Sequence, residues 1–573
     1  MNERLADLQQ RAREAWESLH SSGRPRILVG TAACGRSAGA LKVLDTFRRQ
    51  LEDRRLEAHL IEVGCMGLCY AEPVVGIARP GQPLICYGSV TPDRAAEVLE
   101  RCLVRGELLP DLALGSVGEQ TVAGVPRLLD TPVFRPQVRR ILRHCGFIDP
   151  SDIHHYLAHG GYSGLAKALE VGPEEVIGEL QRSGLRGRGG AGFPTWRKWR
   201  LAHDTKAAKK FVVCNGSEGD PGVFSNRVLM ESDPHSVLEG ILIAGYAVGA
   251  DEAYIYCPAE SPLALERLQT AVAQMQEHGL LGEGILGSSF TLHITITQGA
   301  GAYVCGEETA LLEFIQGRRG VPQCRPPFPP VSGLAGFPTV VNNVETLACA
   351  TLILRYQGRW FAELGTGNHT GTKLVCLSGN ICRSGVAEVP FGIPLRELLS
   401  AAGGGATEGT NIKAVHLGGP AGGVLPPDRF DVPLDQDSLL TLGASLGSGG
   451  VVVIGEDTCM VDLARNSLDF SRQACCGRCV PCRLGTEQLY RIVDDIASGQ
   501  GEGQDLTLLA ELSEGIKLGS LCGLGQTAPN TLLSTLRYFR DEYEAHIQRR
   551  ECPAAVCVPA ERLAFPADGP TRK

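Results

Sequence analysis

The sequence of 573 residues contains no run of eighteen or more apolar residues, and so offers no candidate for a membrane-spanning helix. It also lacks a long basic tract or an arginine-rich helix. With a formal net charge of −9, it does not have the character of a nucleic-acid-binding protein. The first residues, MNERLADLQQRAREAWESL, are charged and amphipathic, without the apolar segment of a signal peptide. We therefore expect a cytoplasmic protein that associates with membranes only through partners.

Cysteine and glycine, in contrast, are abundant. A disulfide framework is typical of small secreted domains, so the 21 cysteines of this large chain are better explained by metal ligation. Many of the 71 glycines are bunched, as in GRGGAGFP, GAGAY and GGPAGG. Because apolar strands flank these clusters, they indicate backbone held close to a ligand.

Apolar patterning predicts a multidomain α/β protein. Residues 1–24 predict a helix, and residues 25–105 follow the strand–helix–strand–strand–helix order of a small thioredoxin-like domain. Residues 106–130 have the composition of a linker. Residues 131–365 alternate strands and helices, including a long helix from Ser261 to His278, which predicts a parallel, doubly wound sheet.

The remaining chain changes character twice. Residues 366–440 have short strands broken by glycine and proline around one helix, which indicates a compact α+β module. Helices that carry cysteines dominate residues 441–548, and residues 549–573 form a tail that we expect to be loosely ordered after Cys557.

Four cysteines have the spacing of a [4Fe–4S] site. Cys476, Cys479 and Cys482 are separated by two residues each, and Cys522 follows in the glycine-rich segment GSLCGLG. A cubane cluster needs three ligands close in sequence and a fourth that the fold brings in. A structural zinc site that uses the same four cysteines is the alternative.

The ordered motifs GLRGRGGAGFPTWRKW, VVCNGSEGDPG, GAGAYVCGEETAL, RPPFPP, NNVETLA and CCGRCVPCRLGT carry a family resemblance over residues 130–548. They resemble the NADH-oxidising flavoprotein subunit of respiratory complex I. They are still more similar to the homologous subunits of NAD-linked hydrogenases, formate dehydrogenases and benzoyl-CoA reductase assemblies. The resemblance implies FMN, NAD(H) and a [4Fe–4S] cluster, an atypical Rossmann-like domain without GxGxxG, a β-grasp module at 366–440 and a helical cluster domain.

The resemblance also implies cofactor-binding residues. The loop Gly187, Arg188, Gly189, Gly190, Ala191, Gly192 and Phe193 would hold FMN, with Lys198 near the flavin and Phe193 on the nicotinamide side. Asn215 and Glu218 would contact FMN and Asp220 the nicotinamide nucleotide, and Ser217 replaces the family's usual aspartate. A carboxylate near the adenosine ribose would favour NADH over NADPH.

A second set completes the pocket that the resemblance implies. Tyr303 and Gly306 precede Glu307, which would lie beside FMN, and Glu308, which would lie beside NADH. Phe328 would stack on the adenine, Arg325 stands where the family often has lysine, and Asn342 and Asn343 would contact FMN. Leu201 replaces a second aromatic residue, which weakens the expected stacking.

Two further cysteine groups suggest metals. Cys65-x3-Cys69, with Cys34 upstream, resembles a thioredoxin-like [2Fe–2S] domain, although a fourth ligand (Cys86 or a non-cysteine residue) is needed and a clusterless domain is the alternative. Cys459, His546, Cys552 and Cys557 match a closed zinc site, with unligated thiols in the tail as the alternative.

The predicted function is an NADH:acceptor oxidoreductase subunit. Hydride would pass between NADH and FMN, and single electrons would then pass through the [4Fe–4S] cluster to iron–sulfur partner subunits. The alternatives are an NAD⁺-reducing or bifurcating subunit, whose motifs would be the same, and a non-catalytic assembly subunit, against which the intact GRGGAGFP and GEE motifs argue.

Overall fold

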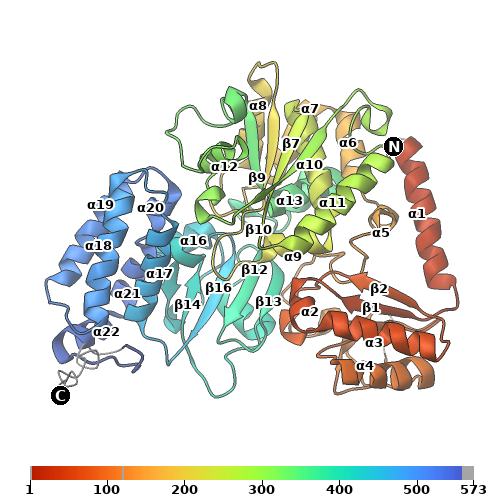
Figure 1. Cartoon of the computed structure of the whole chain (residues 1–573), viewed down its shortest axis with the longest axis horizontal. Coiled ribbons are helices and arrows are strands. Elements are labelled where there is room, and N and C mark those ends of the chain that lie inside the picture. Colours follow the sequence, from red (N-terminus) through yellow and green to blue (C-terminus); the bar gives the residue numbers. More distant parts are fainter. Residues whose placement is uncertain (1–2, 119–121, 558–573) are drawn as a thin grey trace, which may run out of the picture.

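Helix α1 (Glu3–Ser21) stands at one edge of the computed structural model, which describes residues 3–118 and 122–557 (Figure 1). Its buried face carries Leu5, Gln9 and Ala12. The side chain of Gln9 donates a 2.8 Å hydrogen bond to the carbonyl of Gly161 and so ties the helix to the flank of the next domain. The helix predicted at the N-terminus is confirmed over the described residues.

The N-terminal domain contains a five-stranded sheet in the order β2-β1-β3-β4-β5, in which β1 and β2 are parallel and the other neighbours antiparallel. Its elements are β1 (Arg26–Gly30), α2 (Ala33–Ser37), α3 (Ala40–Asp53), β2 (His59–Val63), η1 (Cys69–Ala71), β3 (Val75–Ala78), β4 (Leu84–Tyr87), α4 (Pro92–Val98), the π-helical turn η2 (Leu99–Arg105) and β5 (Ala113–Val117). The prediction of a linker over 106–130 is wrong at β5, because that strand pairs with β4 and extends the sheet.

The central domain is built on a four-stranded parallel sheet in the order β8-β7-β6-β9, which confirms the predicted parallel arrangement. Asn215 and Asn343 are register partners at the carboxyl ends of β6 and β9. The elements run η3 (Leu128–Asp130), α5 (Ile153–Ala158), α6 (Ser163–Val171), α7 (Pro173–Ser183), α8 (Thr195–Asp204), β6 (Phe211–Asn215), α9 (Ser225–Ser232), α10 (Pro234–Val248), β7 (Glu252–Pro258), α11 (Pro262–Glu277), η4 (Ile285–Gly287), β8 (His293–Gly299), η5 (Tyr303–Gly306), α12 (Glu308–Ile315), η6 (Leu334–Gly336), β9 (Thr339–Asn343), α13 (Val344–Tyr356) and α14 (Gly358–Ala362).

A second five-stranded sheet, in the order β13-β12-β16-β14-β15, follows the central domain. Its elements are the short pair β10 (Gly365–Thr366) and β11 (His369–Thr370), then β12 (Thr372–Gly379), β13 (Gly385–Pro390), α15 (Leu395–Glu397), η7 (Leu398–Ala402), β14 (Ile412–Leu417), η8 (Gly419–Ala421), β15 (Gly423–Leu425), η9 (Pro427–Arg429), α16 (Gln436–Thr441) and β16 (Gly450–Gly455). Strand β16 lies between β12 and β14, so the sheet extends past the predicted boundary at residue 440. The β-grasp and thioredoxin-like descriptions stay predictions.

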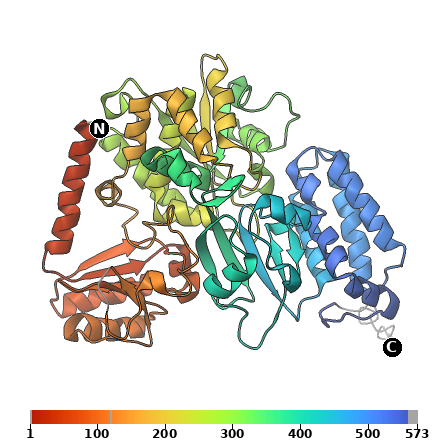
Figure 2. The ribbon, with the colours of Figure 1, turned by 180° about the vertical axis from the view of Figure 1, so that it is seen from behind.

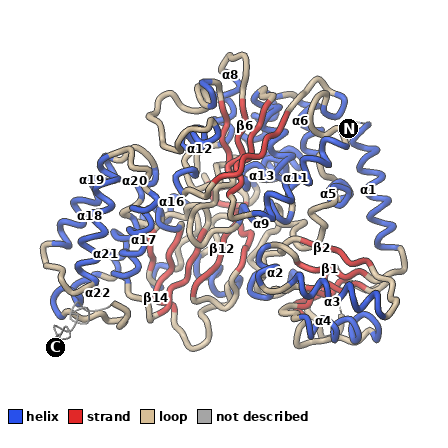
Figure 3. The backbone as a smooth tube through the Cα atoms, in the orientation of Figure 1, coloured by secondary structure: helices blue, strands red, loops and turns tan. Residues whose placement is uncertain are grey.

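Helices make up the C-terminal domain after β16. They are α17 (Met460–Ala474), α18 (Val480–Ala497), α19 (Asp505–Gly519), α20 (Gly523–Thr527), α21 (Asn530–Tyr538), α22 (Arg540–Glu544) and η10 (Ala545–Arg549). Figures 1 to 3 place this domain and the N-terminal domain at opposite ends, with the central domain and second sheet between them. The last part of the predicted tail, 558–573, lies outside the described residues. No helix within the described ranges is long and apolar enough to cross a bilayer.

Candidate functional site

The glycine-rich loop between α7 and α8 closes on itself and lies against the carboxyl end of β9. The N–H of Gly187 donates to the carbonyl of Phe193 at 2.9 Å, and Gly190 and Gly192 have φ of 109° and 62°. A Cβ on Gly189 would approach Cβ of Asn343 to 3.1 Å. The sequence therefore needs glycine here both for the turn and for the close approach.

The side chains of the loop divide between the interior and the surface. The Arg188 guanidinium donates to the carbonyl of Thr370 at 2.7 Å and lies over the Phe391 ring, so only its backbone remains with the loop. Ala191 and Phe193 are exposed at the tip. The exposed Phe193 ring is free of the core and fits the predicted contact with a planar ligand.

The two asparagines at the end of β9 are held by their own hydrogen bonds. Asn342 is buried and its Oδ1 accepts from Trp199 Nε1 at 2.8 Å. Asn343 Oδ1 accepts from the N–H of Glu345 at 2.9 Å, which caps α13, while its Nδ2 donates to Asn226 at 3.1 Å. These bonds fix the amide orientations at the floor of the site.

The segment after β6 is equally well fixed. Asn215 Nδ2 donates to the carbonyl of Gly306 at 3.1 Å, and its Oδ1 accepts from the N–H of Ser217 at 3.0 Å. Glu218, at φ 42°, accepts from the backbone N–H of Arg227 at 2.8 Å, near the start of α9. Burial raises the pKa of Glu218 to about 7. Its carboxylate thus anchors the first turn of α9.

Asp220 connects three parts of the chain. Its Oδ2 accepts a hydrogen bond from the Ser448 hydroxyl, and Tyr303 also bonds to this carboxylate. Burial raises the pKa of Asp220 above its ordinary value. A Cβ on Gly219 would meet the Tyr303 ring at 2.9 Å, so the glycine lets this ring pack on the loop.

The two adjacent glutamates at the start of α12 share Arg325 and differ in their other partners. Glu307 is the N-cap and accepts from the N–H of Ala310 at 2.9 Å. Glu308 pairs with Lys198 Nζ at 2.9 Å and with the Arg325 guanidinium at 3.3 Å. Phe328 is 51 % exposed, with Arg325 5.9 Å from its ring centre. The predicted division of the two carboxylates is consistent with this geometry.

The residues gathered here suit a ligand with hydroxyl or N–H donors. Within the described residues, Asp220 Oδ1 and Glu307 Oε1 are buried and accept no hydrogen bond, and Glu307 Oε1 has only an ion pair with Arg325 at 3.7 Å. A buried acceptor without a donor is costly, so a ligand that donates to both oxygens would be stabilised. The ribityl hydroxyls and ring N–H of FMN are such donors, and the bare loop backbone leaves room for a planar ring.

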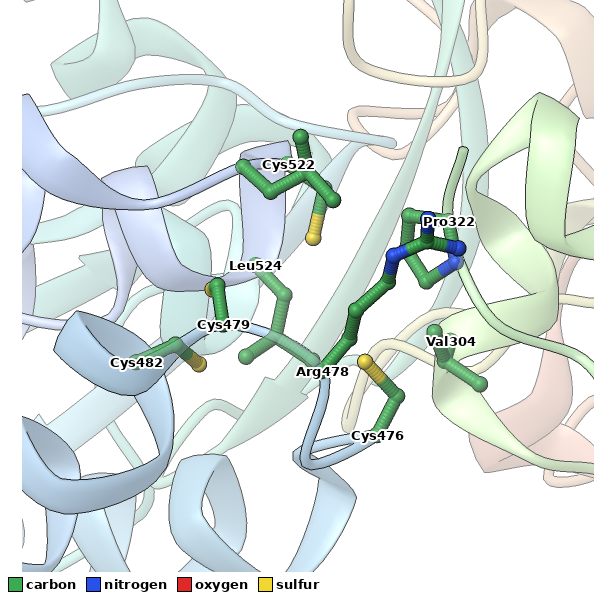
Figure 4. Close-up of a pocket in the computed structure, with 9 residues that line it drawn as sticks. Val304, Pro322, Cys476, Arg478, Cys479, Cys482, Cys522 and Leu524 are labelled. Atoms are coloured by element: carbon green, nitrogen blue, oxygen red, sulfur yellow. The ribbon is translucent and has the colours of Figure 1, made fainter. Parts of the chain in front are cut away.

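The four cysteines of the predicted cluster surround one pocket (Figure 4). Cys476 lies in the loop after α17, Cys479 caps α18, Cys482 lies in its first turn and Cys522 caps α20. Figure 4 shows the sulfurs of Cys476, Cys482 and Cys522 directed into the pocket. The other lining residues are Val304, Pro322, Arg478, Leu521 and Leu524. Apolar side chains of this kind limit the access of water to a cluster.

The distances between these sulfurs distinguish a [4Fe–4S] site from a site for a single zinc ion. In the described chain, the sulfurs of these four cysteines do not all lie within 4.8 Å of one another. A tetrahedral zinc ion would need its sulfurs about 3.8 Å apart, from Zn–S bonds of about 2.3 Å. The wider ring fits a four-iron cubane better than the zinc alternative. Cys475, whose sulfur lies 3.4 Å from that of Cys482, is an additional thiol beside it.

One short segment is shared by both halves of the site. Val304 of η5 lines the cysteine pocket, whereas its neighbour Tyr303 packs against Gly219 in the loop after β6. The Tyr303 ring packs edge-on against Phe470 of α17 at 5.1 Å, and Arg319 donates to the carbonyl of Cys476 at 2.9 Å. The cysteine pocket and the predicted flavin pocket therefore have a common wall, η5.

The C-terminal group assembles as predicted. The ligand atoms of Cys459, His546, Cys552 and Cys557 all lie within 4.8 Å of one another. Hydrogen bonds from Cys557 and His546 lower the pKa of Cys459 to about 4, which favours a thiolate at neutral pH. The His546 Nδ1 bonds to the carbonyl of Glu542 at 2.7 Å and leaves Nε2 facing the thiols. Such an arrangement is typical of a zinc ligand.

Cys34, Cys65 and Cys69 also gather within 4.8 Å, but Cys86 does not belong to that group. Cys86 instead lies in β4 among buried apolar side chains, so that proposed fourth ligand is wrong. Sequence patterns offered no signal for Ser448 and Lys373, whereas Trp199 and Glu345 lie within the motifs GLRGRGGAGFPTWRKW and NNVETLA without their buried contacts being predicted.

Comparison with known proteins matches both halves of the site. The Nuo51 FMN-binding domain matches residues 180–351, and the NADH-ubiquinone oxidoreductase-F iron-sulfur binding region matches residues 462–546. The NADP-reducing hydrogenase subunit HndC of Solidesulfovibrio fructosivorans is 50% identical over 75% of this chain and 87% of its own length. The F 2 subunit of the NADH-quinone oxidoreductase of Rhizobium meliloti is 45% identical over 72% of this chain and 98% of its own.

A solved structure extends the likeness to nearly the whole chain. A chain of an NAD+-reducing [NiFe]-hydrogenase in the H2-reduced state matches with a TM-score of 0.65 and 27% identity. The match covers 97% of this chain and 91% of that one.

Proposed function

This chain belongs to the family of NADH-quinone oxidoreductase F subunits, the NADH-binding FMN and iron–sulfur proteins, and from that premise we propose how its residues divide the work. The glycine loop and the ends of β6 and β9 hold FMN, and the side of Glu308, Arg325 and Phe328 receives the nicotinamide nucleotide. When bound, the flavin exchanges a hydride with the nicotinamide, and the iron–sulfur cluster carries single electrons.

The residues of this chain act by orientation and electrostatics. Gly187 to Phe193 bring backbone to the flavin edge, where no side chain obstructs it. Glu307 Oε1 accepts a hydrogen bond from the flavin and Asp220 Oδ1 accepts one from the nicotinamide nucleotide, and their neighbours Ala310 and Ser448 hold them in place. Lys198, bound to Glu308 and to the carbonyl of Val341 at 2.9 Å, supplies a positive charge at the rim of the site.

The shared wall η5 is the observation that carries the proposal. Val304 lines the cysteine pocket and its neighbour Tyr303 packs against Gly219 in the loop after β6, which supports a short path between the two proposed cofactor sites. Cys476, Cys479, Cys482 and Cys522 would hold the [4Fe–4S] cluster, which would supply single-electron transfer toward partner subunits. Relatives are named as subunits of a quinone oxidoreductase and of a hydrogenase, and we infer that this chain likewise works in a larger redox complex whose partners set the direction.

We further propose that the nucleotide is NADH. Glu307 and Glu308 share Arg325, and Glu308 also pairs with Lys198, so the support for NADH is a carboxylate able to accept hydrogen bonds from the ribose hydroxyls rather than a net negative charge. The adenine would rest on Phe328, with Leu201, 46 % exposed, as a weaker second contact.

The test is to purify the chain, release its flavin with acid and measure NADH-dependent ferricyanide reduction. We expect bound FMN and turnover with NADH. Glu308→Gln should lower kcat/KM for NADH about tenfold, because Lys198 and Arg325 lose their charged partner. Glu283→Gln, at a position of the same domain outside these contacts, is the matched control and should retain full activity. A flavin-free protein without ferricyanide reductase activity would instead identify a non-catalytic assembly subunit.

We also propose that Cys459, His546, Cys552 and Cys557 bind one zinc ion that holds the end of the chain against α17 and η10. The four ligand types and their convergence within 4.8 Å support this assignment. Zinc analysis before and after Cys552→Ser tests it, since wild-type protein without zinc would refute the site.

A further inference from the structure

Three large aliphatic side chains are exposed on the helices that carry the cysteine pocket. Val480 and Leu484 of α18 are each 55 % exposed, and Leu518 near the end of α19 is 79 % exposed. A single exposed aliphatic residue is ordinary, whereas several at one place on a surface are typical of an interaction site. We call Val480, Leu484 and Leu518 the aliphatic patch.

The members of the aliphatic patch come from two helix ends that pack together. A Cβ on Gly519 would meet Pro481 Cγ at 2.9 Å, so the end of α19 touches the start of α18. Val480 directly precedes Pro481, and Leu518 directly precedes Gly519. Leu484 lies one turn after Val480 and on the same side of α18.

The first turn of α18 separates the aliphatic patch from the cysteine pocket. Cys482 lies between Val480 and Leu484 in sequence, and its sulfur is directed into the pocket (Figure 4). With about 3.6 residues per turn, its side chain leaves the helix on the side opposite to the other two. A protein that covers the patch would therefore be separated from the pocket by little more than one helix, about 10–12 Å with side chains.

Three exposed arginines hold the cysteine loop beside this patch. Arg319 donates to the carbonyl of Cys476 at 2.9 Å, and Arg483 donates to the carbonyl of the next residue. Arg478 lines the pocket and donates to the side-chain amide of Gln323 at 2.8 Å. Over residues 3–118 and 122–557, none of the three arginines pairs with an aspartate or glutamate. A chain with a net charge of −9 thus has uncompensated positive charge at this place.

We propose that the aliphatic patch and these arginines bind an iron–sulfur partner protein whose contact face carries aspartate or glutamate around an apolar centre. The proposal rests on the proposed function, in which single electrons leave by way of the adjacent cluster. Arginine guanidinium groups pair well with carboxylates, and opposite charges around an apolar centre orient two proteins as they associate.

An anionic lipid surface has the same charge as such a partner and also takes up aliphatic side chains. The position of the patch favours a protein, because the cysteine pocket lies one helix away and a lipid headgroup does not accept electrons. Lipid binding is therefore an outcome that the experiments below distinguish.

The first experiment identifies what covers the patch in the native assembly. The full chain, tagged before α1 and expressed in its native host, carries a photo-crosslinking side chain in place of Leu484. We expect a cross-link to an iron–sulfur protein, in a peptide that contains aspartate or glutamate. Leu41 of α3, 42 % exposed at the opposite end of the molecule, is the control position and should not give that cross-link (Figure 1). A cross-link to a second copy of this chain, or to no iron–sulfur protein, would overturn the proposal.

The second experiment tests the charge of the partner with two double variants. Leu484→Asp/Leu518→Asp and Leu484→Lys/Leu518→Lys both remove the aliphatic contact, but only the aspartates repel carboxylates. The iron–sulfur partner recovered per tagged chain should fall about tenfold with aspartate and clearly less with lysine. Leu41→Asp should leave the recovery unchanged. Equal losses in the two double variants, or full recovery in both, would overturn the proposal.

Two further measurements separate this proposal from its rivals. Sedimentation of the wild-type chain with phosphatidylserine vesicles, lost in the aspartate variant, would overturn the proposal in favour of a lipid surface. NADH:ferricyanide activity and the [4Fe–4S] electron paramagnetic resonance signal should be the same in both double variants as in wild type, because neither residue contacts the predicted cofactors. Wild-type protein without that activity would contradict the proposed function, whereas retained activity with unchanged partner recovery would contradict only the docking site.

Discussion

The buried pair Lys373–Glu345 gives the sharpest test of how the flavin pocket is supported. Their side chains are 3 % and 1 % exposed, and they join β12 of the second sheet to the start of α13, two residues after Asn343. Glu345 also accepts from the N–H of Leu374 at 2.9 Å, and Lys373 donates to the Leu374 carbonyl at 2.9 Å. A Cβ on Gly449 would meet Lys373 Nζ at 3.1 Å, so the pair also supports the loop that carries Ser448.

Lys373→Met should lower the free energy of unfolding by about 3–5 kcal/mol, because it leaves the Glu345 carboxylate buried without a cation. Lys373→Met/Glu345→Met removes both charges and leaves mainly the Leu374 N–H without an acceptor, which costs about 1–3 kcal/mol. The double variant should therefore be more stable than the single variant. If the two substitutions acted additively, the double variant would be the less stable of the two.

Urea titration with pulse proteolysis, followed for fragments that contain β12 and α13, measures these differences. Arg396→Met is the matched control, since it breaks the exposed pair with Asp431 and should not change stability measurably. If Lys373→Met is as mild as this control, or if the double variant is less stable than Lys373→Met, the assignment of a desolvated ion pair is refuted.

Three further predictions concern the cluster, the nucleotide and acid stability. Cys522→Ser should abolish the [4Fe–4S] electron paramagnetic resonance signal while FMN stays bound. Cys475→Ser should retain both the signal and FMN. Loss of the signal in both variants would contradict the ligand assignment. The ratio of kcat/KM for NADH to that for NADPH should exceed one, and Glu308→Gln should reduce it; an unchanged ratio would remove Glu308 from nucleotide selection. Burial lowers the pKa of His416 to about 4, so the unfolded chain binds the proton first. The free energy of unfolding should consequently fall by about 3 kcal/mol between pH 6.5 and pH 4. If the urea midpoint of His416→Gln falls with pH as steeply as that of the wild type, this histidine is not the cause.

Periodicity predicted the elements that bury one face. The parallel sheet, α1 and α11 are confirmed because their apolar spacing is set locally. Strand β5 was missed because ALGSV is short and its pairing with β4 is a tertiary property. Strand β16 was assigned to the wrong unit for the same reason, since only its pairing with β12 and β14 shows where it belongs.

The site shows a similar division. Motif spacing predicted the cysteine site, since Cys476, Cys479 and Cys482 are close in sequence and line one pocket with Cys522, whereas Glu307 and Glu308 came from the family resemblance. Spacing could not reveal that Ser448 holds Asp220, because 228 positions separate the two residues. Nor could it identify Glu72 as the partner of Cys34, since that contact depends on the fold of two loops and on the absence of side chains at Gly30 and Gly35.

The opposite placement of the N-terminal and helical domains has a practical consequence for isolating the assembly (Figure 2). An affinity tag before α1 would stand at the far end from the Cys476–Cys522 pocket, where electron-accepting subunits are proposed to dock. A tag after Cys557 would lie beside the helical domain and the C-terminal cysteine group. The first position therefore leaves the cysteine pocket clear of the tag.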